Sequence, residues 1–360
     1  MTIVQYITPS RMGGAEAYFL RLCEFLARRG HRVIVITKRD ALLRVEAEKL
    51  KPIGVEVYGW HTRGKFDLWT LIRLVYLLRR ERVEIINTHL TTAAWMGAWG
   101  GKIARVPCAA WIHGRDEKTW FQWADVLIVV AEAVREFLIE QGVSPHRIEL
   151  HYLGVDVQEF SPFSPAQKLA AKAKLGLLPT ARTVAVVGHL SPRKGHRFLI
   201  EALALLPRDV ELLLAGEGVL EPELRAQATA LGVSERVHFL GFQGDVKRVL
   251  SATDVFCLPS LKEGLPLSVM EAQACGVVVV ASQMAGVPEV VREGETGFLC
   301  RVGDAASLRR AIERALRSID AQEDIGAQAR AFMTDHFASQ EQLEGVEAFL
   351  LRMSRGKTRK

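Results

Sequence analysis

The feature that most constrains the fold is an alternation of short apolar runs with amphipathic stretches of helix length. It fills residues 3–151 and starts again at residue 184. Strand and helix in strict alternation predict βαβ units, which build a parallel sheet covered by helices on both faces. The run Val33-Ile34-Val35-Ile36 is apolar throughout, as a strand buried on both faces should be. The sequence therefore predicts two doubly wound α/β domains.

The alternation is interrupted between residues 154 and 183. Ser161-Pro162-Phe163-Ser164-Pro165 cannot hold a regular strand, and a short Ala/Lys-rich helix is predicted after it. We expect a first domain over residues 1–160, a linker over 161–182 and a second domain over 183–336.

Composition excludes several classes of protein. The 360 residues carry 47 Lys and Arg against 41 Asp and Glu, a mild excess that permits an anionic partner without requiring one. Five cysteines without a C-x-x-C pair argue against a disulfide set and a zinc site and favour a reducing compartment. The first residues lack a signal-peptide pattern, and no apolar window reaches the roughly 18 residues of a membrane-spanning helix. We expect a cytoplasmic protein.

The most informative segment follows an expected strand that ends at Leu258. In open α/β sheets, ligands bind beyond the carboxyl ends of strands, at helix N-termini. Pro266 favours a helix start, so the amides of residues 264–268 are expected to favour a diphosphate. Glu263 would lie in the preceding loop, and Glu271 in the second turn of the helix, where either could accept hydrogen bonds from sugar hydroxyls. Either glutamate alone could equally be a cap or a solvated side chain.

The first domain offers similar positions. Gly13 and Gly14 open a predicted helix after the first strand, where their amides could approach an anion or form only a flexible turn. His89 and His113 each stand at the end of a predicted strand. A histidine there could serve a ligand or be satisfied by backbone groups.

Taken together, the motifs and their order resemble the retaining family 4 glycosyltransferases of the GT-B fold. The element Glu263-x7-Glu271 lies within Pro-Ser-x-x-Glu-Gly-x-Pro-x-x-x-x-Glu-Ala. Further matching segments are Gly13-Gly14-Ala15-Glu16, Gly30-His31-Arg32-Val33, His113-Gly114, Ala124-Asp125, Gly154-Val155-Asp156, Gly188 with Lys194-Gly195, Cys275–Ser282, Gly286–Val291 and Gly294–Leu299. The resemblance runs from about residue 3 to residue 349.

The resemblance implies a fold and a reaction. Two Rossmann-like domains would face a central cleft, with a C-terminal helix at 337–354 crossing back to complete the first, acceptor-binding domain. The second domain would bind the donor. The reaction would move a sugar from a UDP- or GDP-sugar to a glycan or lipid-linked acceptor with retention of configuration, in bacterial polysaccharide or lipopolysaccharide biosynthesis.

The resemblance also implies roles for individual residues. Glu263, His113 and Lys194 would be catalytic, and Gly13 and His89 would be weaker candidates on the acceptor side. The donor would be bound by Gly14, His189, Arg193, Gly264, Leu265, Leu267, Glu271 and Phe239. His189 departs from the family, which often has an arginine there, so Lys194 would carry most of the charge compensation for the diphosphate. The sequence has no Asp-x-Asp motif, and neither a metal nor another cofactor is expected.

Residues 66–82 permit one further expectation. Leu68, Leu71, Ile72, Val75 and Leu78 recur at helical spacing, with Arg73, Arg79, Arg80 and Arg82 nearby. Such a helix could lie on an anionic membrane at the cytoplasmic face of the inner membrane, or could simply pack on the sheet.

Competing functions remain open at this point. A sugar-nucleotide epimerase or a non-catalytic nucleotide- or glycan-binding protein could use a related fold. A dinucleotide oxidoreductase is disfavoured, because Gly216-Glu217-Gly218 is only a fragment of its fingerprint. No nucleic acid partner is expected, and the oligomeric state is left open.

Overall fold

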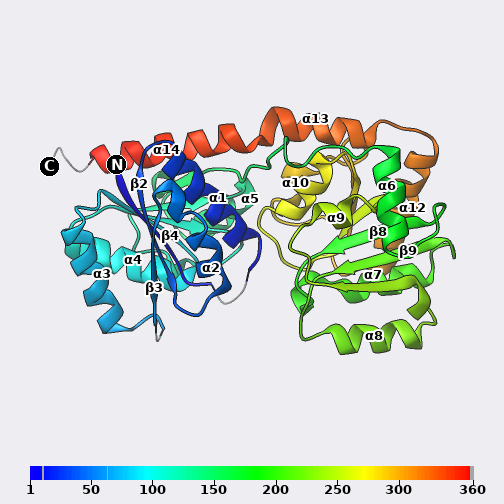
Figure 1. Cartoon of the computed structure of the whole chain (residues 1–360), viewed down its shortest axis with the longest axis horizontal. Helices are drawn as coiled ribbons and strands as arrows, with labels where there is room; N and C mark the ends of the chain where they lie inside the picture. The colour runs from blue at the N-terminus through cyan, green and yellow to red at the C-terminus, as the bar shows by residue number, and fades with distance from the viewer. Residues whose placement is uncertain (10–11, 63, 357–360) are drawn as a thin grey trace. The chain divides into compact units, whose positions relative to one another are not determined.

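A computed structural model describes residues 1–9, 12–62 and 64–356. The chain divides into two compact units. The first unit comprises residues 1–153 and the segment from Gln340 onward, and the second comprises residues 154–339. Each unit is built around one parallel sheet (Figure 1).

The first unit contains a seven-stranded sheet in the order β3-β2-β1-β4-β5-β6-β7, with every neighbouring pair parallel. The strands are β1 (Thr2–Ile7), β2 (Arg32–Lys38), β3 (Glu56–Trp60), β4 (Ile85–His89), β5 (Cys108–Ile112), β6 (Val126–Val129) and β7 (Ile148–Leu150). Strands β4 and β5 are buried along their whole length. The sequence of β5 is apolar, as a buried parallel strand predicts, whereas β4 also buries the polar side chains of Asn87, Thr88 and His89.

Helices connect these strands in the predicted rhythm. They are α1 (Gly14–Arg28), α2 (Leu42–Glu48), α3 (Leu68–Arg80), α4 (Thr91–Ala104) and α5 (Glu132–Glu140), with 3-10 turns at Lys51–Ile53, Lys118–Trp120 and Pro145–Arg147. The C-terminal helix α14 (Ser339–Gly356) is held to this unit by Glu347. Its carboxylate lies 3.2 Å from Arg29 Nε and 2.7 Å from His31 Nε2. The implied packing of the C-terminal helix on the first domain is confirmed.

The second unit contains a six-stranded parallel sheet in the order β10-β9-β8-β11-β12-β13. The strands are β8 (Arg182–Val187), β9 (Val210–Ala215), β10 (Val237–Gly241), β11 (Val255–Leu258), β12 (Val278–Ser282) and β13 (Phe298–Cys300). Its helices are α6 (Pro165–Lys174), α7 (His196–Ala204), α8 (Glu221–Ala230), α9 (Lys247–Leu250), α10 (Leu267–Ala274), α11 (Val287–Val290), α12 (Ala305–Asp320) and α13 (Ile325–Phe337), with 3-10 turns at Pro192–Lys194 and Ser234–Arg236.

Residues 161–182, expected to form a linker, instead pack within the second unit. Ser164 caps α6 by accepting a hydrogen bond from the Gln167 amide, which turns the proline-rich stretch into a helix start. Further along α6, the buried Lys172 donates to the Asp254 carboxylate at 2.7 Å. Leu177 is buried in the same cluster as strand residues of β8 and β9. The segment therefore belongs to the second unit.

Helix α3 also differs from its predicted pattern. The predicted apolar stripe is not one buried face, since Leu68 and Ile72 are exposed whereas Leu78 is buried. The face that packs inward is instead formed by Thr70, Leu74, Leu77 and Leu78. Leu74 lies against Gly100 of α4, where a Cβ would come within 2.7 Å of it, so this glycine allows the two helices to approach closely.

Candidate functional site

The loops that follow β8 and β11 bring Lys194 and Glu263 together. Lys194 Nζ donates to Glu263 Oε1 at 2.6 Å, although the two residues are 69 positions apart in the chain. Only 17% of the Lys194 side chain and 11% of the Glu263 side chain are exposed. This ion pair at the carboxyl edge of the sheet joins two of the three predicted catalytic residues.

Gly195 explains how these two loops can lie so close. Its φ is +67°, and a Cβ there would lie 2.0 Å from the carbonyl oxygen of Pro259. The Arg193 carbonyl also accepts a hydrogen bond of 2.7 Å from the Leu261 amide. Only glycine combines this backbone conformation with so close an approach. The turn that carries Lys194 is therefore fixed against the loop that carries Glu263.

The predicted diphosphate site surrounds the start of α10. Gly264, Leu265 and Leu267 are buried there, and the Gly264 carbonyl accepts a hydrogen bond of 3.0 Å from the Gly286 amide. The N-cap residue is Pro266, whose side chain makes no capping hydrogen bond. First-turn amides without a cap favour an anion. Glu271 follows in the second turn and is half-buried.

The other predicted donor residues of this unit have different environments. His189, just after β8, is half-buried, whereas Arg193 is exposed. Phe239 on β10 is half-buried, and the Arg225 guanidinium lies 4.1 Å from its ring centroid. One face of the Phe239 ring is therefore covered within the unit.

Sequence reasoning missed His196, the first residue of α7. It is buried, and neither ring nitrogen has a hydrogen-bond partner among the described residues. Burial lowers the pKa of His196 to about 4, and the nearby Lys194 charge adds to the effect. Its position directly after Lys194-Gly195 was a signal that could have identified it.

The Gly216-Glu217-Gly218 fragment has a structural explanation. A Cβ on Gly216 would lie 2.0 Å from the Gly188 carbonyl oxygen, and one on Gly218 would lie 2.2 Å from that of Leu190. The two glycines thus allow the loop after β9 to pack against the loop after β8. The resemblance to a dinucleotide fingerprint reflects this close packing.

In the first unit, Gly13 and Gly14 lie at the start of α1, and both are exposed. Glu16, which sequence reasoning did not select, is buried one turn later. Its Oε2 lies 3.2 Å from the position that a Cβ on Gly13 would take. A side chain at residue 13 would therefore crowd this carboxylate.

The two predicted histidines of the first unit lie in contact at the ends of β4 and β5. His89 Nδ1 is 3.1 Å from His113 Nε2, and the two rings stack with centroids 5.4 Å apart. Burial lowers the pKa of His113 to about 4 and that of His89 well below its ordinary value. Both imidazoles are therefore neutral at neutral pH. The structure brings the candidate catalytic histidine and the candidate acceptor-side histidine into one cluster.

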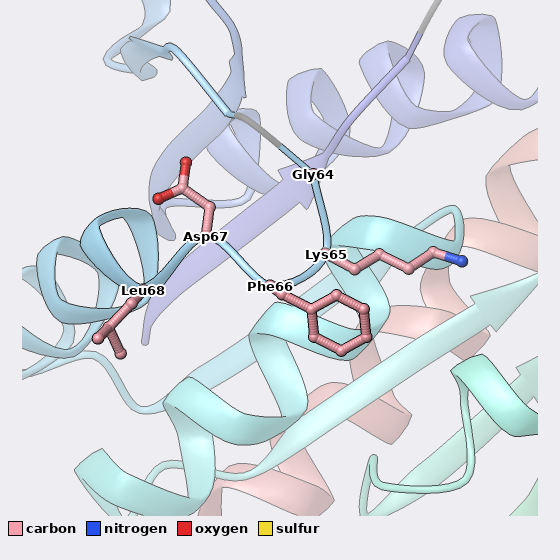
Figure 2. A pocket seen from close by; sticks show the side chains of 5 residues that line it. All are labelled: Gly64, Lys65, Phe66, Asp67 and Leu68. Carbon is pink, nitrogen blue, oxygen red and sulfur yellow. The ribbon is translucent and has the colours of Figure 1, made fainter.

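Two open hollows lie away from these residues. One, of about 480 Å³, is lined by Gly64–Leu68 (Figure 2). The other, of about 530 Å³, lies in the second unit beside Pro162, Cys275 and Arg330. Neither includes a predicted site residue. Within the part of the chain that the structure describes, no three His, Cys, Asp or Glu side chains gather as metal ligands would.

Comparison with known families matches both units. Residues 12–159 match the Glycosyltransferase Family 4 model, and residues 167–332 match the model described as Glycosyl transferases group 1. Together these matches span most of the chain.

Individual relatives agree with this assignment. A D-inositol 3-phosphate glycosyltransferase of Mycobacterium sp. (strain KMS) is 33% identical over 84% of this chain and 78% of its own length. An Escherichia coli UDP-Gal:alpha-D-GlcNAc-diphosphoundecaprenol alpha-1,3-galactosyltransferase is 30% identical, over 69% of this chain and 70% of its own length. Anabaena Alr3699/HepE, solved in complex with UDP, has a TM-score of 0.86 at 24% identity and covers 97% of this chain and 99% of its own.

The fold is therefore GT-B, and the chain is a glycosyltransferase. It belongs to the family described by the Glycosyltransferase Family 4 and Glycosyl transferases group 1 models. The predicted fold, family and enzyme class are confirmed. The comparisons do not support the epimerase, the oxidoreductase or the non-catalytic binding protein. The roles assigned to individual residues stay predictions.

Proposed function

We propose that the enzyme transfers a sugar from a nucleoside-diphosphate sugar, a UDP-sugar in the first instance, to a glycan or lipid-linked acceptor with retention of configuration. Two relatives support this choice of substrates. The E. coli relative is named for a UDP-galactose donor and an undecaprenol-linked acceptor, and Anabaena Alr3699/HepE has been solved with UDP-glucose. A role in polysaccharide or lipopolysaccharide biosynthesis is part of the same proposal.

The observation that carries the proposal is the Lys194–Glu263 pair beside the uncapped start of α10. Departure of a diphosphate needs positive charge held in place before the reaction. Lys194 and the first-turn amides of α10 supply that charge. Once the donor is bound, Lys194 turns toward the phosphate, and the Glu263 carboxylate accepts hydrogen bonds from sugar hydroxyls. Glu271 would bind the ribose.

The same charges make a metal unnecessary in this proposal. Lys194 and the helix amides do what a divalent cation does for the diphosphate in other glycosyltransferases. The leaving phosphate oxygen would take the acceptor proton on the same face of the sugar, which preserves the configuration. Turnover that survives EDTA supports this part, and turnover restored only by Mg²⁺ or Mn²⁺ contradicts it. The anomeric proton of the product, measured by NMR, tests retention.

Donor binding is tested by thermal shift against a panel of UDP-, GDP-, ADP- and TDP-sugars. A ligand at about 100 times its Kd stabilises the folded state by about 2.7 kcal/mol, which raises the melting temperature measurably. We expect one UDP-sugar to stabilise the wild type and the control variant Arg208→Ala, because Arg208 is an exposed cation with no predicted role in donor binding. The same sugar should not raise the melting temperature of Lys194→Met. If no nucleotide sugar stabilises the wild type, the proposed reaction is wrong.

We also propose that the first unit contacts an anionic membrane surface, at the cytoplasmic face of the inner membrane. No helix in the described part of the chain is long and apolar enough to cross a bilayer. The outer face of α3 exposes Trp69 (77%), Tyr76 (62%) and Ile72 (51%), opposite the face that packs inward. A helix that is apolar on both faces needs a second partner.

Aromatic side chains extend this surface beyond α3. Phe66 points from its loop toward α4 (Figure 2), with its ring centroid 5.1 Å from that of Trp95. Trp95 is followed by Trp99 and then Trp123, at centroid distances of 6.1 and 5.3 Å. Lys102 lies 4.7 Å from the Trp123 ring centroid. Aromatic rings flanked by cations suit the headgroup layer of an anionic bilayer, where tryptophan is enriched.

Sedimentation with phosphatidylcholine vesicles, prepared with and without phosphatidylglycerol, tests this contact. We expect the wild type to bind the anionic vesicles more tightly. The double variant Trp69→Ser/Tyr76→Ser should release it, and Phe242→Ser should not, since Phe242 is an exposed ring of the second unit. If the double variant and Phe242→Ser bind the anionic vesicles equally, the membrane contact is assigned to the wrong surface. The proposal is also wrong if the wild type is a dimer that only the double variant dissociates, because the surface then serves self-association.

A further inference from the structure

A buried chain of hydrogen bonds leads to His113 from the interior of the first unit. Trp111 Nε1 donates to Asn87 Oδ1 at 2.9 Å. Asn87 Nδ2 lies 2.9 Å from Gln5 Oε1 and 3.3 Å from His89 Nε2. His89 Nδ1 in turn lies 3.1 Å from His113 Nε2. All of these residues are on β1, β4 or β5, or directly after β5.

The direction of the first two bonds is fixed by chemistry. The indole nitrogen of Trp111 can only donate, so the Asn87 atom that it contacts must be the carbonyl oxygen. The other Asn87 atom is therefore the amide nitrogen, with two hydrogens to donate. One hydrogen goes to the Gln5 oxygen and the other to His89 Nε2. His89 must accept at Nε2.

The remaining bond follows from this direction. An imidazole that accepts at Nε2 is neutral and carries its proton on Nδ1. His89 therefore donates from Nδ1 to His113 Nε2, and His113 also accepts at Nε2. The proton of His113 then lies on Nδ1. That atom is buried and has no acceptor among the described residues.

We infer that Trp111, Asn87 and His89 are positioning residues that fix one tautomer of His113, so that His113 donates a hydrogen bond from Nδ1 to an oxygen of the bound substrate. The identity of that oxygen, a sugar hydroxyl, rests on the proposed function, whereas the tautomer does not. A buried donor without an acceptor is costly, and a substrate oxygen would remove that cost. In this role His113 is a neutral donor and not a general base.

Histidine-selective ¹⁵N NMR on the whole protein reads the tautomer directly. We expect His113 of the wild type to show a protonated Nδ1 and an unprotonated Nε2. Asn87→Leu removes the donor that sets the direction, so His113 should become a mixture of tautomers. If Asn87→Leu does not fold, Trp111→Phe serves as the second variant, because it removes only the indole donor at the start of the hydrogen-bond chain. The inference is overturned by a wild-type His113 that is protonated at Nε2, or by a spectrum that neither variant changes.

Kinetics separate this role from a merely structural one. Asn87→Leu should lower kcat about three- to tenfold, the value of one hydrogen bond, with little change in the donor KM. His113→Gln keeps an amide donor but has no tautomer to set. Asn87→Leu added to His113→Gln should therefore have no further effect on kcat. An equal loss in both backgrounds contradicts the inference. The two proposals can fail separately. If His113 of the wild type shows the expected single tautomer but no nucleotide sugar raises the melting temperature, the tautomer inference stands and the proposed function is wrong.

Discussion

The two units place different chemistry at equivalent positions of the same scaffold. In the first unit, the ends of β4 and β5 carry the buried His89 and the half-buried His113, which are both neutral. In the second unit, the loops after β8 and β11 carry the oppositely charged Lys194 and Glu263. Both pairs lie at the carboxyl edge of a parallel sheet, the edge where α/β folds bind ligands.

The difference is explained by what surrounds each pair. Lys194 can remain charged with little exposure because a carboxylate lies 2.6 Å away. No carboxylate pairs with His113 among the described residues, and desolvation lowers its pKa and holds it in the neutral form. One sheet edge therefore offers a fixed charge, whereas the other offers a directed hydrogen bond. Four predictions test this contrast, beginning with the largest effect.

Removal of the Lys194 charge should have the largest effect on catalysis. Lys194→Met keeps the length of the side chain but removes its charge, and kcat/KM for transfer should fall about 10²- to 10³-fold. Steady-state kinetics on the best donor of the panel measure this. Arg208→Ala is the control, since it removes an exposed cation of the same unit that has no predicted role in donor binding and should change kcat/KM little. Unchanged kinetics in Lys194→Met would show that the ion pair is only structural.

The close approach that fixes the pair should be the next most sensitive feature. Gly195→Ala places a Cβ at the Pro259 carbonyl, so we expect about 2–3 kcal/mol of destabilisation and weaker donor binding. Gly232 has the same φ of +67° with no atom within 4 Å of a Cβ. Gly232→Ala should therefore cost only the backbone strain, about 1 kcal/mol. Urea denaturation measures the free energy of unfolding of both variants and so separates the clash with Pro259 from the backbone strain. If both variants lose the same free energy, the close approach at Gly195 is not what destabilises the protein.

The sequence was sufficient for the architecture because buried parallel strands leave a clear apolar signal. The apolar run at residues 33–36 lies within β2, and the strand that was expected to end at Leu258 does end there, as β11. Strand β13 was missed because three residues, Phe298–Cys300, are too few to show a pattern. Residues 161–182 were predicted as a linker because the prolines interrupt the alternation. The short helix predicted there is present, but it is capped by Ser164 and belongs to the second unit.

The candidate site was predicted as separate residues and not as contacts. Lys194 and Glu263 are 69 positions apart, and their contact depends on loop conformations that motif spacing does not specify. The histidine contact had a signal that was not used. His89 pairs in register with Trp111 on the neighbouring strand, and His113 follows Trp111 on the same face. A contact between the two histidine side chains could therefore have been predicted if the order of β4 and β5 had been known.

The neutrality of His113 predicts a specific dependence of stability on pH. Its pKa in the folded state is about 4, against an ordinary value of 6.5. Below pH 6.5 the unfolded chain takes up a proton that the folded chain does not, so the free energy of unfolding falls as the pH falls toward 4. One such group contributes about 3 kcal/mol over this range. The free energy of unfolding, measured with urea at several pH values, should show a smaller slope for His113→Asn.

A His113→Asn protein with the wild-type slope would mean that His113 titrates normally. The contrast between a neutral edge and a charged edge would then fail for the first unit.

The smallest effect is expected at His189, where the family often has arginine. If Lys194 already compensates the diphosphate, His189→Gln should lower kcat/KM only about two- to fivefold, the lower part of the range for one hydrogen bond. His189→Arg restores a permanent charge with planar donors and should match or exceed the wild type. Donor kinetics at constant ionic strength measure both variants beside Lys194→Met. If kcat/KM falls further in His189→Gln than in Lys194→Met, the essential positive charge is that of His189, in the loop directly after β8, and not that of Lys194. The second unit would then resemble the first in relying on a histidine at a strand end.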